Sequence, residues 1–306
     1  MKRLHLNLEL TAVIVLLAAG VLLPVMLSTA VGIVALVIAR DAGGIVTGVL
    51  VISFAVTATG SALVTVVLAG RKARLARRQA DFVANVSHEF RTPLSAIRLY
   101  AQTLQSGKLD GDTEQTAQCL ATILRETEWL DLMIDRVLTW RASSKDMLPL
   151  NLVTQPVTQA VTDAAQRFER MVVRDEMDFA CKTSSRLPVE HDVNALNSVV
   201  LNLLTNAYKY SGKHKRIRLT ARDEDGGVAI EVQDNGNGLT PAEMKRIFQP
   251  FYRARRQDGG ASGAGLGLAI ARHLVTRLRG VVTVTSEKGR GSIFTIKLPA
   301  PNVEGG

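Results

Sequence analysis

Residues 82–94 read FVANVSHEFRTPL, and the rest of the chain is organised around this stretch. If it is helical, His88 is two residues from both Val86 and Phe90 and lies roughly 200° around the helix from them. His88 should therefore point away from the core, with Thr92 on the same face and Glu89 about 100° to the side. An exposed histidine beside polar groups is common on helix surfaces, so its role depends on the surrounding sequence. The apolar stripe that defines the buried face comprises Phe82, Val86, Phe90, Leu94, Ile97, Ala101 and Leu104.

Two uncharged apolar segments precede this stretch, at residues 10–39 and 42–70. A membrane-spanning helix needs about 20 apolar residues, so each segment is long enough to cross a bilayer once. Lys2 and Arg3 lie before the first segment, and a basic cluster follows the second. Because cationic residues favour the cytoplasmic side, we expect a transmembrane hairpin with both chain ends in the cytoplasm. The basic cluster comprises Arg71, Lys72, Arg74, Arg77 and Arg78.

A cleaved signal peptide is the alternative for the first segment, with Ser28, Thr29 and Ala30 as its cleavage site. Apolar sequence that continues to residue 39 argues against this alternative. The two segments are separated only by Arg40 and Asp41, so almost nothing is expected outside the membrane. We therefore expect no extracytoplasmic ligand-binding domain.

The formal net charge of +9 raises the question of nucleic-acid binding. Aromatic residues make up only 5% of the chain, no zinc-ligand spacing stands out, and the basic cluster has a membrane explanation. We expect no nucleic-acid partner. Cys119 and Cys181 fall in regions that we assign to the cytoplasm, so we expect free structural thiols.

Residues 71–144 are predicted to form a helical hairpin. Gly107 and Asp112 bound its turn, and Pro93 is expected to bend the first helix. Two helices alone bury too little surface to be stable, so a homodimer that forms a four-helix bundle is the leading interpretation. The helical period of the second helix is carried by Leu120, Ile123, Thr127, Leu130, Ile134 and Val137.

Residues 145–300 change to a mixed pattern, and residues 301–306 form a tail. Strands are predicted at 177–182, 217–222, 228–233, 281–285 and 292–298, where β-branched residues alternate with polar ones. Helices are predicted at 156–171, 193–210, 241–247 and 266–278. The chain is therefore predicted to be multidomain: two transmembrane helices within residues 1–70, the helical hairpin, and an α+β two-layer sandwich.

One face of the predicted helix at 193–210 carries Asn202, Asn206 and Lys209, at positions i, i+4 and i+7. Amide oxygens suit a Mg²⁺ ion, and an ammonium group suits phosphate. An ordinary polar helix face would show the same pattern. These residues alone therefore do not establish a nucleotide site.

Two glycine-containing segments follow this helix. Residues 234–238, DNGNG, come after a predicted strand; Asp234 can accept a hydrogen bond from an adenine amino group, and Gly236 and Gly238 let the backbone approach a base. Residues 259–268, GGASGAGLGL, open onto a helix whose N-terminus offers N–H groups to phosphate. This segment is neither a P-loop nor a dinucleotide fingerprint. A simple turn and a flexible linker are the alternatives.

Taken in order, these blocks resemble those of the sensor histidine kinases of bacterial two-component systems, over residues 81–299. HEFRTPL at 88–94 is similar to the phosphoacceptor motif of the family. NLLTNAYKY at 202–210, DNGNG at 234–238, FQPFYR at 248–253 and GAGLGL at 263–268 resemble its ATP-site blocks. The resemblance implies a dimeric HisKA-type phosphoacceptor domain at 71–144 and a Bergerat-type ATP-binding domain of the HATPase_c kind at 145–300.

The resemblance also implies a role for each motif residue. ATP would phosphorylate the His88 imidazole, Glu89 would orient the ring and accept its proton, and an aspartate of a separate response regulator would receive the phosphoryl group. Asn206, helped by Asn202, is similar to the Mg²⁺ ligand of the family, and Asp234 would read adenine. Of the remaining ATP-binding residues, Lys209 and Arg253 would contact phosphates, and Tyr210 would pack near the base or in the core. Gly263, Gly265 and Gly267 would form the lid hinge, and Leu266 between them also belongs to the ATP-binding set.

Thr92 implies a second activity. Members of the family with Glu and Thr at these positions commonly dephosphorylate their response regulator, using the Thr hydroxyl to position water. The alternative is a threonine that bonds back to the carbonyl of Ser87 or His88. The chain departs from the family pattern in two places: no linker domain fits between residues 70 and 81, and Ala264 stands where the family often has a hydroxyl residue.

Two other functions remain open. A membrane-anchored ATPase of the wider superfamily would carry a carboxylate base on the Asn-bearing helix, whereas Asn202 is an amide, which favours transfer. A nucleotide-binding receptor without kinase activity is disfavoured by intact Asn206 and Asp234. We expect a multi-pass protein of the bacterial inner membrane that reads a membrane protein or peptide signal within or beside the bilayer; the sequence identifies neither the signal nor the regulator.

Overall fold

A computed structural model of the chain describes residues 23–107, 109, 111–143, 149–173, 177–252 and 265–300. The chain divides into two compact units, Met1–Ala80 and Asp81–Gly306. One long helix, α3, runs from Ala42 to Gln105 and contributes residues to both units.

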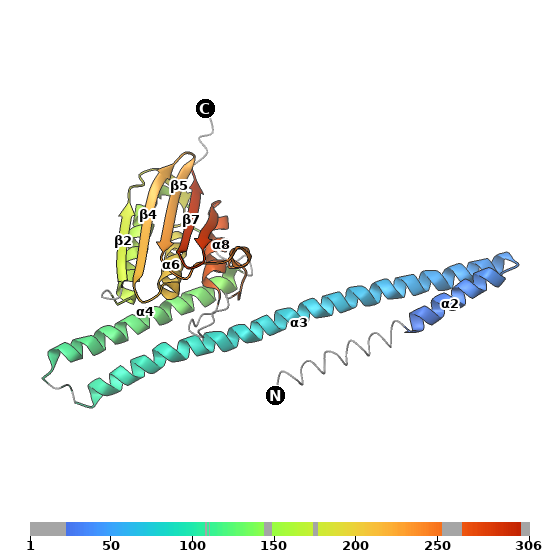
Figure 1. Cartoon of the computed structure of the whole chain (residues 1–306), viewed down its shortest axis with the longest axis horizontal. Helices are drawn as coiled ribbons and strands as arrows, with labels where there is room; N and C mark the ends of the chain where they lie inside the picture. Colours follow the sequence, from blue (N-terminus) through green and yellow to red (C-terminus); the bar gives the residue numbers. More distant parts are fainter. Residues whose placement is uncertain are drawn as a thin grey trace. The chain divides into compact units, whose positions relative to one another are not determined.

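The first unit contains α2, Leu23–Ile38, and the first part of α3, and α2 lies alongside the start of α3 (Figure 1). The two helices approach closely at two glycines. A Cβ atom on Gly32 would lie 2.7 Å from Ile52 Cγ1, and one on Gly48 would lie 2.6 Å from Leu36 Cγ. Both distances are shorter than van der Waals contact. Glycine is therefore what allows the helices to pack this closely.

Among the described residues, one helical segment, Ala42–Ala73, is long and apolar enough to span a membrane. This finding confirms the apolar, helical character predicted for residues 42–70. The apolar helix described before it, Pro24–Ile38, is shorter. The remainder of the first predicted span lies outside the described residues, so the structure supports one of the two predicted spans.

The second unit begins with the part of α3 that carries His88, which is followed by α4, Thr113–Ser143. Helix α3 continues through Pro93, so the helix tolerates this proline; the bend expected there stays a prediction. The turn before α4 ends at Asp112, whose Oδ1 accepts a hydrogen bond from the N–H of Gln115 at 2.9 Å. This bond satisfies one of the free N–H groups at the start of the helix. The predicted helical hairpin is confirmed.

Part of the apolar surface of this hairpin remains exposed in the single chain. Leu120 and Ile134 belong to the stripe predicted for the second helix, yet they are 50% and 46% exposed. The stripe of α4 that packs on the sandwich is a different one, around the buried Leu132. The exposed apolar side chains on α3 and α4 include Leu94, Leu99, Leu120, Leu124, Ile134 and Leu138.

The remainder of the second unit is the predicted α+β sandwich. Its sheet has five strands in the order β2-β4-β5-β7-β6, with β2 and β4 parallel and the other pairs antiparallel. The strands are β2 (Met177–Thr183), β4 (Lys215–Glu224), β5 (Gly227–Asp234), β6 (Val281–Glu287) and β7 (Gly291–Pro299). All five were predicted. A small antiparallel pair, β1 (Val153–Pro156) with β3 (Pro188–His191), was not.

Helices form the second layer, on one face of the sheet (Figure 1). They are α5 (Thr158–Met171), α6 (Val193–Tyr210) and α8 (Gly267–Arg277); the short α7 (Pro241–Met244) ends earlier than the predicted helix at 241–247. Alternating side chains of β4, such as Ile217 and Leu219, point into the core between the layers. Phe168 of α5 is completely buried there, with its ring 5.2 Å from that of Phe179.

Helix α6 is the central helix of this layer and carries most of the predicted nucleotide-binding residues. It begins at Asp192, whose carboxylate accepts the N–H of Ala195 at 2.8 Å. Ten of its residues are buried, and both α5 and α8 pack against it.

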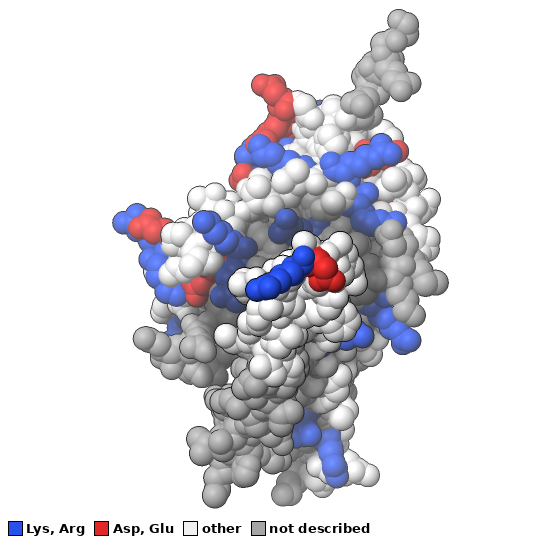
Figure 2. Space-filling model, turned by 90° about the vertical axis from the view of Figure 1, so that its right-hand side faces the viewer, with Lys and Arg blue, Asp and Glu red and all other residues white. Residues whose placement is uncertain are grey.

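Basic side chains are scattered over the face of the molecule seen in Figure 2, several of them beside acidic ones.

Candidate functional site

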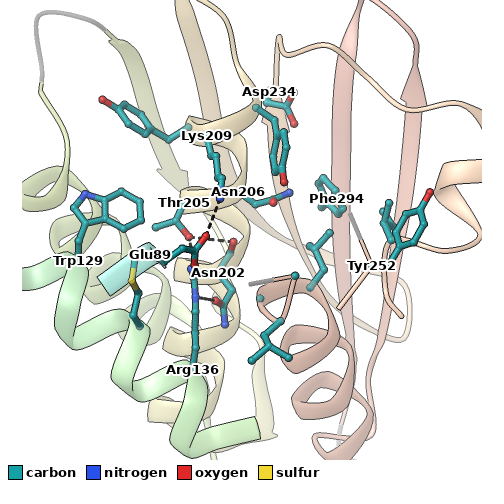
Figure 3. Close-up of a pocket in the computed structure, with 18 of the residues that line it drawn as sticks. Glu89, Trp129, Arg136, Asn202, Thr205, Asn206, Lys209, Asp234, Tyr252 and Phe294 are labelled. Carbon is teal, nitrogen blue, oxygen red and sulfur yellow. Dashed lines mark hydrogen bonds and ion pairs between the residues drawn. The ribbon is translucent and has the colours of Figure 1, made fainter. Parts of the chain in front are cut away.

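A cavity of about 430 Å³ opens in the second unit between the helical layer of the sandwich and the helical hairpin (Figure 3). Its walls come from α6, the start of α8, the segment after β5, and facing residues of α3 and α4. Most of the predicted site residues meet here: Glu89, Thr92, Asn202, Asn206, Lys209, Tyr210, Asp234, Gly238, Gly265, Leu266 and Gly267 line the cavity.

Three of the predicted ATP-binding residues are placed differently or lie outside the described residues. Gly236 is not part of the lining and instead donates its N–H to Asp234 Oδ1 at 2.8 Å. Arg253 and Gly263 lie outside the described residues, so their predicted roles stay predictions.

The three polar residues of α6 share the wall of the cavity, as their spacing predicts. Lys209 forms an ion pair with Glu89, with Nζ 3.6 Å from Oε1. Asn202 is 1% exposed, and its Nδ2 has no hydrogen-bond partner among the described residues. Figure 3 shows Asn202, Asn206 and Lys209 along one side of the helix, facing residues of the hairpin. Residues of two domains therefore interact directly in this cavity.

Arg136 of α4 is a site residue that the sequence reasoning missed. Its Nε donates to Asn202 Oδ1 and its Nη2 donates to Thr205 Oγ1, both at 2.6 Å. Desolvation by burial lowers the pKa of Arg136 to about 10, opposed by the negative charge of Glu89. Arg136 lies four residues after Leu132, on the face of α4 that packs on the sandwich, but the sequence pattern alone does not identify this face.

Asp234 closes the other end of the cavity, at the end of β5. Its side chain is buried, at 7% exposure, and burial raises the pKa of its carboxyl above the ordinary value, against hydrogen bonds from the backbone of Gly236 and Ser292. A carboxylate has about four lone-pair sites, so one that accepts two backbone hydrogen bonds can still accept another from a ligand amino group.

The glycines beside Asp234 have a packing reason that the sequence did not reveal. A Cβ atom on Gly236 would lie 2.5 Å from the carbonyl oxygen of Tyr210. Gly238 adopts φ +59°, and a Cβ atom there would collide with the carbonyl of Glu287. Both glycines thus allow close approach of this segment to its own chain, and they place Asp234 next to the end of α6.

The predicted glycine-rich segment enters α8 at the cavity. Gly265 has φ +69°, a conformation that favours glycine, and its carbonyl accepts the N–H of Phe251 at 3.0 Å. Phe251 in turn packs edge-on against Trp140 of α4, with ring centroids 5.6 Å apart. The start of α8 is therefore connected through an aromatic pair to the helical hairpin.

His88 is exposed, as the helical phase predicts, and it is not among the residues that line the cavity. Thr92 and Glu89 on the same helix do line it. In this arrangement the carboxylate next to His88 faces the polar side of α6.

The two matched families divide the second unit as its structure does. Residues 78–141 match the "His Kinase A (phospho-acceptor) domain", and residues 191–302 match the "Histidine kinase-, DNA gyrase B-, and HSP90-like ATPase" family.

Named relatives extend this likeness. The chain is 33% identical over 232 residues to the sensor-like histidine kinase SenX3 of Mycobacterium tuberculosis, an alignment that covers 74% of this chain and 55% of SenX3. It is 26% identical over 228 residues to the sensor protein SrrB of Staphylococcus aureus, covering 74% of this chain and 39% of SrrB. The chain thus spans about half the length of these relatives or less.

Among solved structures, full-length ShkA in complex with AMPPNP has a TM-score of 0.49 and 29% sequence identity. The alignment covers 71% of this chain and 45% of ShkA.

Proposed function

The chain belongs to the sensor histidine kinases of bacterial two-component systems, and we propose that it transfers the γ-phosphoryl group of ATP to His88 and then to an aspartate of a response regulator. The observation that carries this proposal is the shared cavity. Glu89 of the phosphoacceptor hairpin and Asn206, Lys209 and Asp234 of the ATPase-like domain all line it. Incubating the full chain with γ-labelled ATP should produce acid-labile, alkali-stable label.

The chemistry of the first step needs a neutral imidazole, because only the neutral ring has a lone pair that can attack phosphorus. A His88 nitrogen would form the new N–P bond while the bond from the γ-phosphorus to the bridging oxygen of ADP breaks. Glu89 would accept the ring proton. Because His88 is outside the cavity lining, we infer that the hairpin and the ATP-binding domain change their packing before transfer.

The residues of the cavity fit a nucleotide with Mg²⁺. Asp234 would accept the adenine amino group, Lys209 would contact phosphates, and backbone groups at Gly265 and Gly267 would face them. Mg²⁺ characteristically takes one or two protein oxygens and completes its shell with phosphate and water. The Asn206 amide oxygen suits this role. Among the described residues there is no group of three or more His, Cys, Asp and Glu that would form an all-protein metal site.

The buried Asp234 carboxylate makes ATP affinity depend on pH. Because burial raises the pKa of Asp234, the carboxylate becomes protonated at a less acidic pH than an exposed aspartate does. Protonation removes the acceptor for adenine, so ATP affinity should decrease as pH falls through this raised pKa, by about tenfold per pH unit below it. Titration calorimetry at a series of pH values measures the effect.

Asp234→Asn is the matched variant for this titration. It should bind ATP weakly at every pH and lose the acidic transition. An unchanged transition in Asp234→Asn would assign it to another group.

We propose that the protein is also a phosphatase for its response regulator, with the Thr92 hydroxyl positioning water. Thr92→Ala should slow dephosphorylation of the regulator roughly tenfold or more, and by a larger factor than it slows autophosphorylation, since misplaced water loses reactive geometry. The decay of the phosphorylated regulator, identified by phosphotransfer profiling, measures this rate. Thr103→Ala on the same helix is the control, because the Thr103 hydroxyl donates a hydrogen bond to the carbonyl of Leu99 one turn earlier, and Thr103 does not line the cavity. Equal dephosphorylation rates in the two variants would remove Thr92 from the mechanism.

We propose that the hairpin forms a homodimeric four-helix bundle. The support is its exposed apolar surface, which includes Leu124 at 68% and Leu138 at 58% exposure. Leu124→Glu should convert the dimer to a monomer, because a charge in an apolar interface is desolvated. Light scattering of the cytoplasmic portion measures the mass. The exposed Gln118 on α4 provides the control variant Gln118→Glu, which should remain dimeric.

We also propose a multi-pass protein of the bacterial inner membrane with cytoplasmic termini. Support comes from the apolar Ala42–Ala73 segment, the basic residues Arg71 and Lys72 at its end, and the second apolar helix α2. The signal would be a membrane protein or peptide read at the bilayer. Transplanting residues 1–70 onto another kinase tests this assignment, and a response that does not follow these residues contradicts it.

A further inference from the structure

The contact of Arg136 with Asn202 fixes the orientation of an amide in the nucleotide site. An arginine side chain has only hydrogen-bond donors, so the atom of Asn202 that it contacts must be the oxygen. Oδ1 of Asn202 lies 2.6 Å from Arg136 Nε. The Nδ2 group is therefore turned away from Arg136, and Figure 3 shows the two side chains meeting between α4 and α6.

The Nδ2 group of Asn202 is a buried hydrogen-bond donor with no acceptor among the described residues. The side chain is 1% exposed, and no described residue accepts a hydrogen bond from Nδ2. Buried polar groups in folded proteins are nearly always paired, and the exceptions tend to be functional. A ligand that fills the cavity can provide the missing acceptor.

The position of Asn202 indicates which part of the nucleotide would do so. Asp234, the adenine-reading residue, lies beside the C-terminal end of α6, because Gly236 is packed against the carbonyl of Tyr210. A nucleotide bound there extends along α6 past Asn206 to Asn202, one turn further. The start of α8 also reaches Asn202, since a Cβ atom on Gly267 would lie 3.2 Å from Asn202 Oδ1 and 3.8 Å from Arg136 Cζ. The terminal phosphate would therefore reach this end of the site.

The charges at this end of the cavity also favour an anion. Among the described residues, Arg136 donates hydrogen bonds to the neutral oxygens of Asn202 and Thr205. The ionisable groups that face it are Glu89 and Tyr210, and Glu89 is also paired with Lys209. Desolvation lowers the pKa of Arg136 to about 10, so the guanidinium stays protonated near neutral pH. Two cations, Arg136 and Lys209, therefore face the one carboxylate of Glu89, and a phosphate would add a second negative charge beside them.

We propose that Asn202 binds the γ-phosphate of ATP through its Nδ2–H group, rather than Mg²⁺ through its oxygen, and that Arg136 is the positioning residue that holds it in this orientation. Arg136 comes from the phosphoacceptor hairpin and Asn202 from the ATP-binding domain. The pair thus allows the site to distinguish ATP from ADP and connects that distinction to the packing of the two domains. This inference rests on the proposed nucleotide site.

The test compares the dissociation constants of ATP and ADP for the full chain in detergent, by calorimetry, with Mg²⁺ and with EDTA. Asn202→Asp keeps an oxygen for Arg136, replaces the Nδ2–H donor by a second oxygen and adds a negative charge. It should weaken ATP binding by at least about tenfold, with or without Mg²⁺, because it loses a hydrogen bond to a charged group and its carboxylate repels the phosphate. ADP binding should change by less than about twofold, which also shows that the variant is folded.

Arg136→Gln removes the group that orients Asn202 and should cause the same selective loss of ATP affinity. Arg141→Gln is the matched control, because Arg141 is an exposed arginine of α4 outside the cavity. Equal losses for ATP and ADP in Arg136→Gln would reduce Arg136 to a structural role. Tighter ATP binding in that variant would identify Arg136 as an inhibitory contact. Retention of ATP affinity by Asn202→Asp in Mg²⁺ alone would identify a metal ligand. Each of these outcomes overturns the proposal.

Failure of this inference is distinguishable from failure of the proposed function. If the wild-type chain neither binds ATP nor becomes labelled, the kinase assignment fails. If the wild type does both and the Asn202 and Arg136 variants keep its ratio of ATP to ADP affinity, only the γ-phosphate contact fails.

Discussion

His88→Gln should abolish the acid-labile, alkali-stable label obtained with γ-labelled ATP, while ATP still binds with an unchanged dissociation constant. Glutamine is similar in polarity to histidine but has no nitrogen lone pair available to attack phosphorus. ATP binding should be preserved because His88 is exposed and is not part of the cavity lining. Autoradiography of the full chain, alongside calorimetry on the same preparation, separates chemistry from binding.

The control for this experiment is His214→Gln. His214 is also an exposed histidine, and it lies before β4, outside the cavity. This variant should be labelled as the wild type is. Label that persists in His88→Gln, or that disappears in His214→Gln, would move the phosphorylation site away from His88.

Asn206→Ala should cause the second large effect, a loss of Mg²⁺-dependent ATP binding and of autophosphorylation by at least about 100-fold. Removal of even an outer partner of a metal ligand typically costs 10–100-fold in affinity or activity, so loss of the ligand itself should have a larger effect. Fluorescent-nucleotide displacement over a Mg²⁺ titration measures the binding, and the labelling assay measures the rate. The wild type should bind ATP more tightly as Mg²⁺ is added, whereas Asn206→Ala should not.

Asn197→Ala is the matched control on the same helix. Asn197 donates its Nδ2 to the carbonyl of Ala160 at 3.4 Å and does not line the cavity. It should keep the Mg²⁺ dependence of the wild type. A normal Mg²⁺ titration in Asn206→Ala would assign the metal to other oxygens.

The sequence predicted the parts of the fold that local patterns determine. Alternation along β4 places Ile217 and Leu219 in the core, and helix geometry alone brings Asn202, Asn206 and Lys209 to one face of α6. The exposure of His88 followed from the same geometry. Periodicity within a single helix or strand was therefore enough to predict which residues share one of its faces.

Contacts between elements were beyond such patterns. Arg136 and Asn202 are 66 residues apart and belong to different domains, so no local period joins them. The apolar period of α4 was recognised, but it does not say which of its apolar residues meet the sandwich; Ile134 is half exposed, whereas Leu132 is buried. Gly236 and Gly238 were assigned to approach of a base, whereas their neighbours in the structure are backbone atoms of the same chain. The sequence therefore predicts which residues are buried better than it predicts which residues they contact.

The two glycine contacts between α2 and α3 determine how that helix pair can move. With side chains of Ile52 and Leu36 already against Gly32 and Gly48, a slide or roll of one helix would drive a bulky group into the other backbone. Closely packed surfaces of this kind have separate stable arrangements instead of a continuous range. We therefore expect α2 and the start of α3 to respond to a stimulus together, by switching between a few distinct packing arrangements. The level of kinase activity would then depend on the fraction of molecules in each packing arrangement.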